Sequence, residues 1–184
     1  IKKKFILTIV LLSYLATAIN AAIVITGLEN MAKDLDLNQS VLSWVQNSYV
    51  LAWGCFMLLG GRLSDAFGRR SILNLSLLLF GIGSLFAGIA TSATILILSR
   101  FIQGVGASIL APTSLALIMD YFTGEERIKA IAWYSSISGL GMCIGLVMGG
   151  TLASFLSWRY GFFIYLPLIV FMLIVSMKVL NKNN

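Results

Sequence analysis

The sequence contains no histidine and little charge of either sign. Charged residues make up 11% of its 184 residues, whereas hydrophobic residues make up 59%. A soluble domain usually has about 25% charged residues, so this chain has too few to cover a water-exposed surface of its size. The composition therefore indicates a protein that crosses a membrane several times. Nucleic-acid binding is not expected, because basic residues in a membrane protein mainly report its topology.

Residues that bind metals or catalyse reactions are also scarce. Cys55 and Cys143 lie in apolar runs without a partner at metal-ligand spacing, so we interpret them as small buried hydrophobic side chains. The acidic residues all fall at or beyond the ends of the apolar runs, which leaves no carboxylate deep in a membrane. A phosphate-binding Gly-x-x-x-x-Gly-Lys-Ser/Thr motif is absent. We therefore expect no metal, no cofactor, no nucleotide hydrolysis and no enzyme activity.

The apolar residues form six segments that are long enough to cross a bilayer, which takes about 20 residues each. They do not alternate with polar residues, so they predict helices rather than the strands of a barrel. The first segment could be a cleaved secretory signal, but its apolar pattern continues to Leu28 and further spans follow. Asn38 or Ser40 is the expected N-cap of the second helix. We expect an all-α bundle over residues 1–184 with spans at about 5–27, 41–60, 71–90, 93–118, 130–153 and 160–179.

Basic residues are concentrated at one set of helix ends. Only Lys33 and Arg159 lie at the opposite ends, and Arg100 lies inside a span. Because cytoplasmic loops retain positive charge, the N-terminus, the second and fourth loops and the C-terminus are predicted to be cytoplasmic in a plasma membrane. The ten basic residues at these ends are Lys2, Lys3, Lys4, Arg62, Arg69, Arg70, Arg127, Lys129, Lys178 and Lys182.

The segment GRLSDAFGRR, residues 61–70, places four charges between the second and third spans. A loop of about ten residues must turn sharply there, and Gly61 and Gly68 would supply the backbone freedom. A cytoplasmic anchor would explain the arginines, but it would not explain Asp65 or the two glycines. Asp65 could cap the next turn or pair with an arginine.

This segment resembles the signature loop of the major facilitator superfamily of transporters, Gly-x-Leu-x-Asp-x-x-Gly-Arg-Arg. The resemblance implies a cytoplasmic latch between two six-span halves, which opens during alternating access. It also implies that Asp120, at the predicted cytoplasmic end of the fourth span, is an acidic partner of the loop. We expect a charge cluster of Asp65, Arg69 and Asp120. The matching positions are Gly61, Leu63, Asp65, Gly68, Arg69 and Arg70.

The fourth span is similar to a second pattern of that family, Arg-x-x-Gln-Gly-x-Gly, at Arg100, Gln103, Gly104 and Gly106. Arg100 would lie about 12 Å into the span. A charge there costs at least about a few kcal/mol unless it faces a partner or a wet cavity, and the alternative is that it snorkels to the outer surface. Gln103 shares its helix face, and Gly104 and Ser108 would allow close helix contact.

Glycines recur every four residues in the fifth span. Close packing through a small-residue face would explain part of this repeat. The repeat also resembles Gly-x-x-x-Gly-Pro-x-x-Gly-Gly, a pattern of proton-driven exporters that sugar importers generally lack. Leu146 replaces the proline of that pattern. The glycines that match it are Gly141, Gly145, Gly149 and Gly150.

Residues 157–167 and the first loop with the second span resemble the fourteen-span drug:proton antiporter group. The resemblance implies secondary active efflux of multiple drugs or lipophilic compounds by proton antiport, driven by the proton gradient. That group commonly has an Asp in the first span where this chain has Asn20, which cannot carry a proton. Glu29 or an acid elsewhere in the protein would have to do so. The alternatives are export of lipid or another solute, import, or a non-transporting sensor or scaffold.

The resemblance covers one six-span half of a two-half transporter, in which the substrate binds between the halves. The printed sequence begins without Met, and we expect a longer protein whose C-terminal half is the partner of this one. A separate second half or two identical halves are the alternatives. The bilayer and a small-molecule substrate are the other expected partners. The residues expected on the substrate wall are Asn20, Gln46, Asn47, Tyr49, Trp53, Arg100, Gln103 and Trp133.

Overall fold

The computed structural model describes residues 2–180, and its regular structure is entirely helical. Six helical stretches in this range are long and apolar enough to cross a membrane, which confirms the expected all-α bundle. Lys182, one of the residues used to predict the orientation, lies outside the described range. The helices are α1 (Lys2–Asp34), α2 (Gln39–Phe67), α3 (Arg69–Gly88), α4 (Ala93–Tyr121), α5 (Gly124–Phe155), α6 (Tyr160–Phe163) and α7 (Tyr165–Val179).

Most helices extend beyond the predicted spans, because polar side chains satisfy their end groups. Of the two predicted candidates, Asn38 and not Ser40 is the N-cap of α2, and its side-chain oxygen accepts a hydrogen bond from a backbone N–H at 2.9 Å. Ser92 caps α4 in the same way. At the other end of α4, Arg127 donates to the carbonyls of Met119 and Phe122 at 3.0 and 2.7 Å. These bonds satisfy carbonyls that have no partner within the helix.

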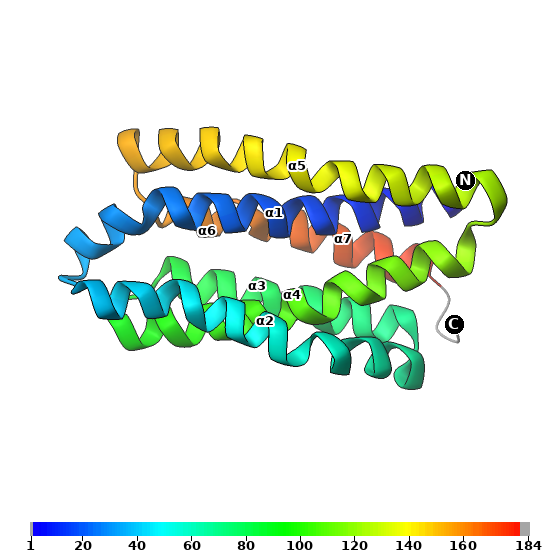
Figure 1. Cartoon of the computed structure of the whole chain (residues 1–184), viewed down its shortest axis with the longest axis horizontal. Helices are drawn as coiled ribbons and strands as arrows, with labels where there is room; N and C mark the ends of the chain where they lie inside the picture. The colour runs from blue at the N-terminus through cyan, green and yellow to red at the C-terminus, as the bar shows by residue number, and fades with distance from the viewer. Residues whose placement is uncertain (1, 181–184) are drawn as a thin grey trace.

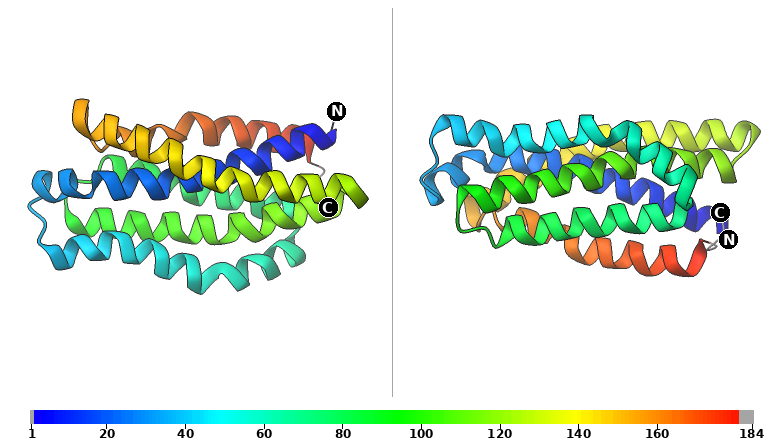
Figure 2. Two further views of the ribbon diagram at one scale, coloured as in Figure 1. Left: turned by 45° about the horizontal axis from the view of Figure 1, so that its top comes forward. Right: turned by 90° about the horizontal axis from the view of Figure 1, so that it is seen from below.

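The helices run roughly along one axis, with α1 and α5 on one side of the bundle and α2, α3 and α4 on the other (Figure 1). The most extensive contacts join α4 to α2 and α3, and α1 to α5. The last helix, α7, contacts both α1 and α3 and so connects the two sides (Figure 2). The buried apolar side chains form a large cluster through α1, α3, α4 and α7, and a smaller one near Trp158 and Phe162.

Two glycines of α4 allow its neighbours to approach closely. A Cβ at Gly104 would lie 2.5 Å from the carbonyl oxygen of Tyr49 on α2. A Cβ at Gly106 would lie 2.6 Å from the backbone nitrogen of Phe80 on α3. Neither distance leaves room for a real side chain. Small residues are therefore required where α4 passes between α2 and α3; the close contact was predicted for Gly104 but not for Gly106.

The glycine repeat of α5 faces α1. Cβ atoms at Gly141 and Gly145 would each lie 2.7 Å from an alanine side chain of α1, and one at Gly149 would lie 2.9 Å from the Cα of Ile23. This confirms the predicted packing face. Gly150 differs, because a Cβ there would have no neighbouring atom within 4 Å. Its place in the repeat therefore has no packing explanation in this structure.

The apolar surfaces of α2 and α5 are the least buried. Only 17% of the most apolar stretch of each helix is buried inside the bundle, compared with 61% for α4. Cys55 on α2 and Cys143 on α5 are both exposed, so our interpretation of them as buried side chains was wrong. Large exposed apolar faces are stable only against lipid or another protein surface.

Candidate functional site

The segment of residues 61–70 does not form the predicted ten-residue loop. Its first seven residues continue α2, and α3 begins at Arg69, so Gly68 alone is not helical. Gly68 has a φ of 86°, in the left-handed region that favours glycine. Helix α2 continues into this segment because Asp and Arg are compatible with a helical end that extends beyond the apolar core. The prediction of a loop failed because hydropathy cannot distinguish such a polar helix end from a loop.

Two consecutive glycines, Gly60 and Gly61, precede this turn, and only Gly61 was predicted to act in it. Gly61 is helical, and a Cβ there would meet only an ordinary contact with Pro112 at 3.9 Å, so its predicted role in the turn was wrong. At Gly60 a Cβ would lie 2.7 Å from the Cα of Ile109 on α4. Gly60 is therefore the residue whose small size matters, because α2 and α4 meet there.

Arg69 forms the centre of a group that we call the inner cluster: Ser64, Asp65, Arg69 and Asp120. Its Nε donates to Oδ2 of Asp120 at 3.0 Å, and its Nη1 donates to the carboxylate of Asp65 and to the hydroxyl of Ser64 at 3.2 Å. One guanidinium thus joins α2, α3 and α4. The structure brings together the three charged residues that we expected. The two carboxylate side chains remain 67% and 44% exposed, whereas that of Arg69 is 20% exposed.

Arg70 lies beside the inner cluster but does not bind an acid among the described residues. Its Nη2 donates to the carbonyl of Met177 at 3.0 Å, in the last turn of α7. A cation at the C-terminal end of a helix satisfies a free carbonyl and interacts favourably with the helix dipole. The two consecutive arginines therefore bind different helices: Arg69 binds α2 and α4, and Arg70 binds α7.

Arg100 is completely buried, so the alternative that it snorkels to the surface was wrong. Its Nη1 donates to the side-chain oxygens of Asn20 at 2.9 Å and Gln103 at 2.7 Å, and its Nε donates to the carbonyl of Val45 at 3.4 Å. The guanidinium carbon lies 4.2 Å from the ring centroid of Tyr49. A cation over an aromatic face is stabilised by the ring quadrupole. Arg100 therefore has partners, but no carboxylate is among them.

Gln103 extends this network to α3, because its Nε2 donates to the hydroxyl of Ser84 at 2.7 Å. We call Asn20, Tyr49, Ser84, Arg100 and Gln103 the buried arginine cluster; these residues come from α1, α2, α3 and α4. The sequence predicted Arg100 and Gln103 on one helix face. It gave no signal for Ser84, which faces them only because α3 packs closely on α4.

The predicted substrate-wall residues do not form a single surface. Asn20, Arg100 and Gln103 are fully buried in the bundle. Gln46 and Tyr49 are partly exposed, and Trp53 is exposed on α2. The two remaining candidates, Asn47 and Trp133, are also exposed. Three of the polar residues predicted for the wall therefore lie inside the bundle rather than on an open face.

The opposite end of the bundle contains an outer cluster of Asp34, Trp158 and Arg159. Oδ2 of Asp34 accepts hydrogen bonds from Nη2 of Arg159 at 3.0 Å and from Nε1 of Trp158 at 3.2 Å. Nη1 of Arg159 also donates to the carbonyls of Gly88 and Ala90, at the end of α3. The guanidinium carbon is 4.4 Å from the Trp158 ring centroid. This cluster was not predicted, and its only sequence signal is a Trp-Arg pair in the turn after the fifth span.

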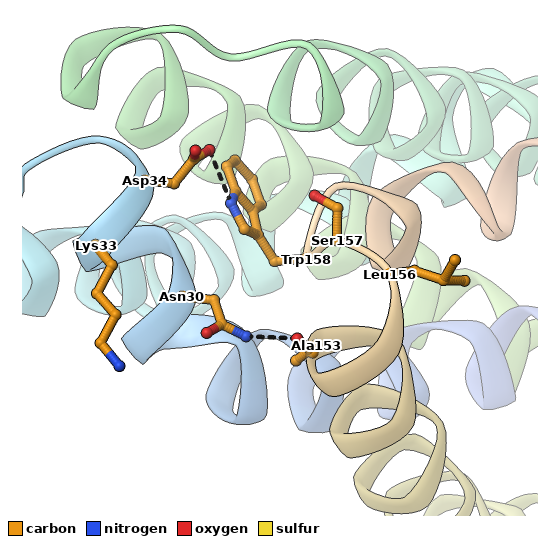
Figure 3. A pocket seen from close by; sticks show the side chains of 7 residues that line it. All are labelled: Asn30, Lys33, Asp34, Ala153, Leu156, Ser157 and Trp158. Atoms are coloured by element: carbon orange, nitrogen blue, oxygen red, sulfur yellow. Dashed lines mark hydrogen bonds between the residues drawn. The ribbon is translucent and has the colours of Figure 1, made fainter.

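A shallow pocket of about 360 Å³ lies beside the outer cluster. Figure 3 shows Asp34 and Trp158 facing each other on one side of it, with Asn30 reaching the carbonyl of Ala153 on another. The Asn30 amide donates that bond at 2.9 Å and holds the end of α1 against α5. The pocket is an open surface feature, and the polar groups around it mainly bind one another.

Comparisons with known proteins are consistent with this geometry. The family model "Major Facilitator Superfamily" matches residues 10–183. The puromycin resistance protein pur8 of Streptomyces alboniger is 40% identical over 88% of this chain and 32% of its own length. Multidrug resistance protein 3 of Bacillus subtilis is 34% identical over 90% of this chain and 32% of its own length. The chain spans about a third of the length of these relatives.

A solved structure shares the fold at low sequence identity. The crystal structure of a D-xylose-proton symporter matches with a TM-score of 0.84 and 18% identity, over 100% of this chain and 49% of that one. At this identity the similarity concerns the arrangement of the helices and not the substrate.

Proposed function

The chain belongs to the Major Facilitator Superfamily, and from this premise we propose that it is the N-terminal half of a secondary transporter that exports small lipophilic compounds. The similarity to proteins named for puromycin and multidrug resistance supports export. The Gly141–Gly149 face of α5 also fits the exporter pattern rather than that of sugar importers. No enzymatic step is part of this proposal.

The inner cluster is the observation that carries the mechanism. Alternating access requires contacts at one end of the molecule to break and form again in each cycle. Ion pairs with exposed carboxylates contribute only about 0–1 kcal/mol each, so they can exchange partners at little cost. Arg69 binds two such carboxylates, those of Asp65 and Asp120. We infer that the cluster is a latch that holds α2, α3 and α4 together when the cytoplasmic side is closed.

The second six-span half is the proposed partner of this chain. The exposed apolar faces of α2 and α5 support this, because each is long enough to cross the bilayer and few of its side chains are buried by its own bundle. The substrate would bind between the halves, near the middle of the membrane. Lipid would cover the remaining apolar surface, in a plasma membrane with the inner cluster on the cytoplasmic side.

The proton gradient is the proposed driving force, without a cofactor. No acidic residue of this chain lies in the middle of the bundle: the seven acids are in the first or last turns of helices, close to such turns, or between helices. Asn20, where an acid would stand in the drug:proton antiporter group, instead accepts a hydrogen bond from Arg100. We therefore place the proton-carrying group in the second half.

Uptake by inside-out membrane vesicles of the full-length protein tests this function. Ethidium, puromycin and pyrenebutyrate provide a cationic, a weakly basic and an anionic lipophilic probe. We expect at least one probe to accumulate when the vesicle interior is acidic, and this uptake to collapse when the gradient is dissipated. Empty vesicles and vesicles with a dissipated gradient are the controls. Absence of gradient-dependent uptake of all three, with the protein inserted normally, would refute the proposed function.

A further inference from the structure

Arg100 carries a full positive charge that no carboxylate of the described residues neutralises. The acidic residue nearest to Asn20 along α1 is Glu29, nine positions later and about 13 Å away along a helix. Glu29 is bound to Lys33 at 2.7 Å. A buried cation is stable only when it is paired or fully hydrogen-bonded. The charge balance of this site is therefore incomplete within the part of the chain that the structure describes.

The hydrogen bonds of the site are also incomplete. Arg100 uses Nη1 and Nε, but its Nη2 is buried and has no partner among the described residues. A guanidinium can only donate, so the oxygen of Asn20 must face it and the amide nitrogen is left over. That nitrogen is likewise buried and without a partner among these residues. Two neighbouring side chains thus hold unused N–H donors beside an uncompensated positive charge.

A carboxylate is the group that would satisfy both needs. It carries one negative charge, only accepts hydrogen bonds when ionised, and fits the fork of a guanidinium. The approach is from α2, where Tyr49 covers the guanidinium and is itself only partly buried. One helical turn later, Trp53 presents an exposed aromatic surface that suits the apolar part of a ligand.

We propose that the buried arginine cluster binds the carboxylate of an amphiphilic anion once Tyr49 turns away, so that the exported compounds are organic anions rather than lipophilic cations. This rests on the proposed export function and names its substrate class. Two other arrangements would complete the site: a carboxylate from the second half, or water molecules on the free donors. Both would leave the protein without a preference for anions.

Binding to the full-length protein in nanodiscs of phosphatidylcholine tests the proposal. This lipid has no net charge, so an anionic headgroup does not compete. Pyrenebutyrate and pyrenebutyltrimethylammonium are matched probes with the same ring and chain and opposite charges, and energy transfer from tryptophan to pyrene reports their binding. We expect the Kd of the carboxylate to be about tenfold lower or better. Equal Kd values would overturn the proposal.

The Asn20→Asp variant makes the test specific to the cluster. It preserves the shape of the side chain and the bond to Arg100 but supplies an internal carboxylate, which competes with the ligand. We expect the preference for the carboxylate probe to fall to about twofold or less. Asn38→Asp is the matched control: it is the same change at the N-cap of α2, where the side-chain oxygen accepts a bond that Asp can also accept, so the preference should be retained. A preference retained in Asn20→Asp, or lost in both variants, would overturn the proposal.

This measurement separates the inference from the function on which it rests, because binding in nanodiscs needs no gradient. Gradient-dependent vesicle uptake of probes without a preference for anions would refute the substrate class and leave the export function standing. Selective binding of the anion without uptake of any probe would support the anion site and refute the export function.

Discussion

The two ends of the bundle use the same side-chain chemistry in opposite arrangements. In the inner cluster one arginine binds two acids, and all its members lie on α2, α3 and α4, on one side of the bundle. In the outer cluster one acid, Asp34, accepts hydrogen bonds from two donors. The members of this cluster connect α1 and the turn after α5, on one side of the bundle, with the end of α3 on the other side. The inner cluster leaves α1 and α5 out, whereas the outer cluster ties both sides together.

This difference suggests different roles for the two ends. The inner cluster has carboxylates that are largely accessible to new partners, which suits contacts that change during transport. In the outer cluster, Arg159 satisfies carbonyls of α3 as well as the acid, so its loss would expose several unpaired groups at once. We expect the inner cluster to control transport and the outer cluster to hold the six helices together as one unit.

The largest expected effect is that of Asp65→Asn on transport. The substitution removes the charge but keeps the size, and leaves Arg69 with one carboxylate, Asp120, beside the hydroxyl of Ser64. We expect the initial rate of gradient-dependent uptake by vesicles to fall by up to about fivefold, because losing an exposed ion pair of up to about 1 kcal/mol shifts a conformational equilibrium by about that factor. The amount of inserted protein should stay unchanged. Arg62→Gln, which changes one charge in the same segment, is the control. Unchanged uptake in Asp65→Asn would contradict the latch and leave the segment only a role as a cytoplasmic anchor.

At the outer end, Arg159→Ala is expected to lower stability. It leaves Asp34 with Trp158 alone and removes a donor from the carbonyls of Gly88 and Ala90. We expect a loss of about 1–3 kcal/mol, seen as a Tm lowered by several degrees for the purified full-length protein in detergent. Lys33→Ala is the matched control, since Lys33 forms an exposed pair with Glu29. If both variants have the same Tm, the outer cluster does not brace the bundle.

A smaller effect is expected for Trp158→Phe. Phenylalanine keeps an aromatic ring in the apolar cluster but cannot donate a hydrogen bond to Asp34. We expect a loss of about 0.5–1.5 kcal/mol, less than that of Arg159→Ala, in the same Tm measurement. Trp44→Phe, on the exposed face of α2, should have almost no effect. A larger loss for Trp158→Phe than for Arg159→Ala would mean that packing, and not the shared acid, holds this end.

The smallest effect is expected for Lys3→Ala at the inner end. Lys3 binds Glu126 at 2.6 Å, but both side chains are more than half exposed. Such pairs contribute about 0–1 kcal/mol, so we expect a Tm within about 1–2 °C of the wild type and unchanged uptake. A marked loss of uptake would show that the inner cluster extends to α1 and α5, and the contrast between the two ends would fail.

The sequence predicted the helices well because each needs only a long apolar run, which hydropathy detects directly. The inner cluster was predicted through the family pattern, which supplied Asp120 as a distant partner of Arg69. The outer cluster was missed because Asp34 and Arg159 are 125 residues apart, and their contact depends on how α1 and α5 lie together. The turn at Gly68 was misjudged for a local reason: a helix end with charged residues has the composition of a loop.

The partners of Arg100 show a further limit of sequence reasoning. Because burying the charge of Arg100 in a membrane is costly, the sequence predicted that Arg100 needs a partner. Helical spacing identified Gln103 on the same face of α4. Asn20 and Tyr49 belong to other helices, and their contacts follow from the close passage of α4 between its neighbours. Glycines at these crossings were visible in the sequence, but the helix that each one faces was not.

The joint at Gly68 also determines where the chain tolerates changes in length. Adding one residue to a helix turns everything beyond it by about 100°. The connection between α1 and α2 has four residues, 35–38, to absorb such a shift. The joint between α2 and α3 has one, so a single inserted residue would carry the Arg69 side chain away from Asp65 or Asp120. Short insertions, such as those used to place peptide tags, are therefore suited to the first connection and not to the second.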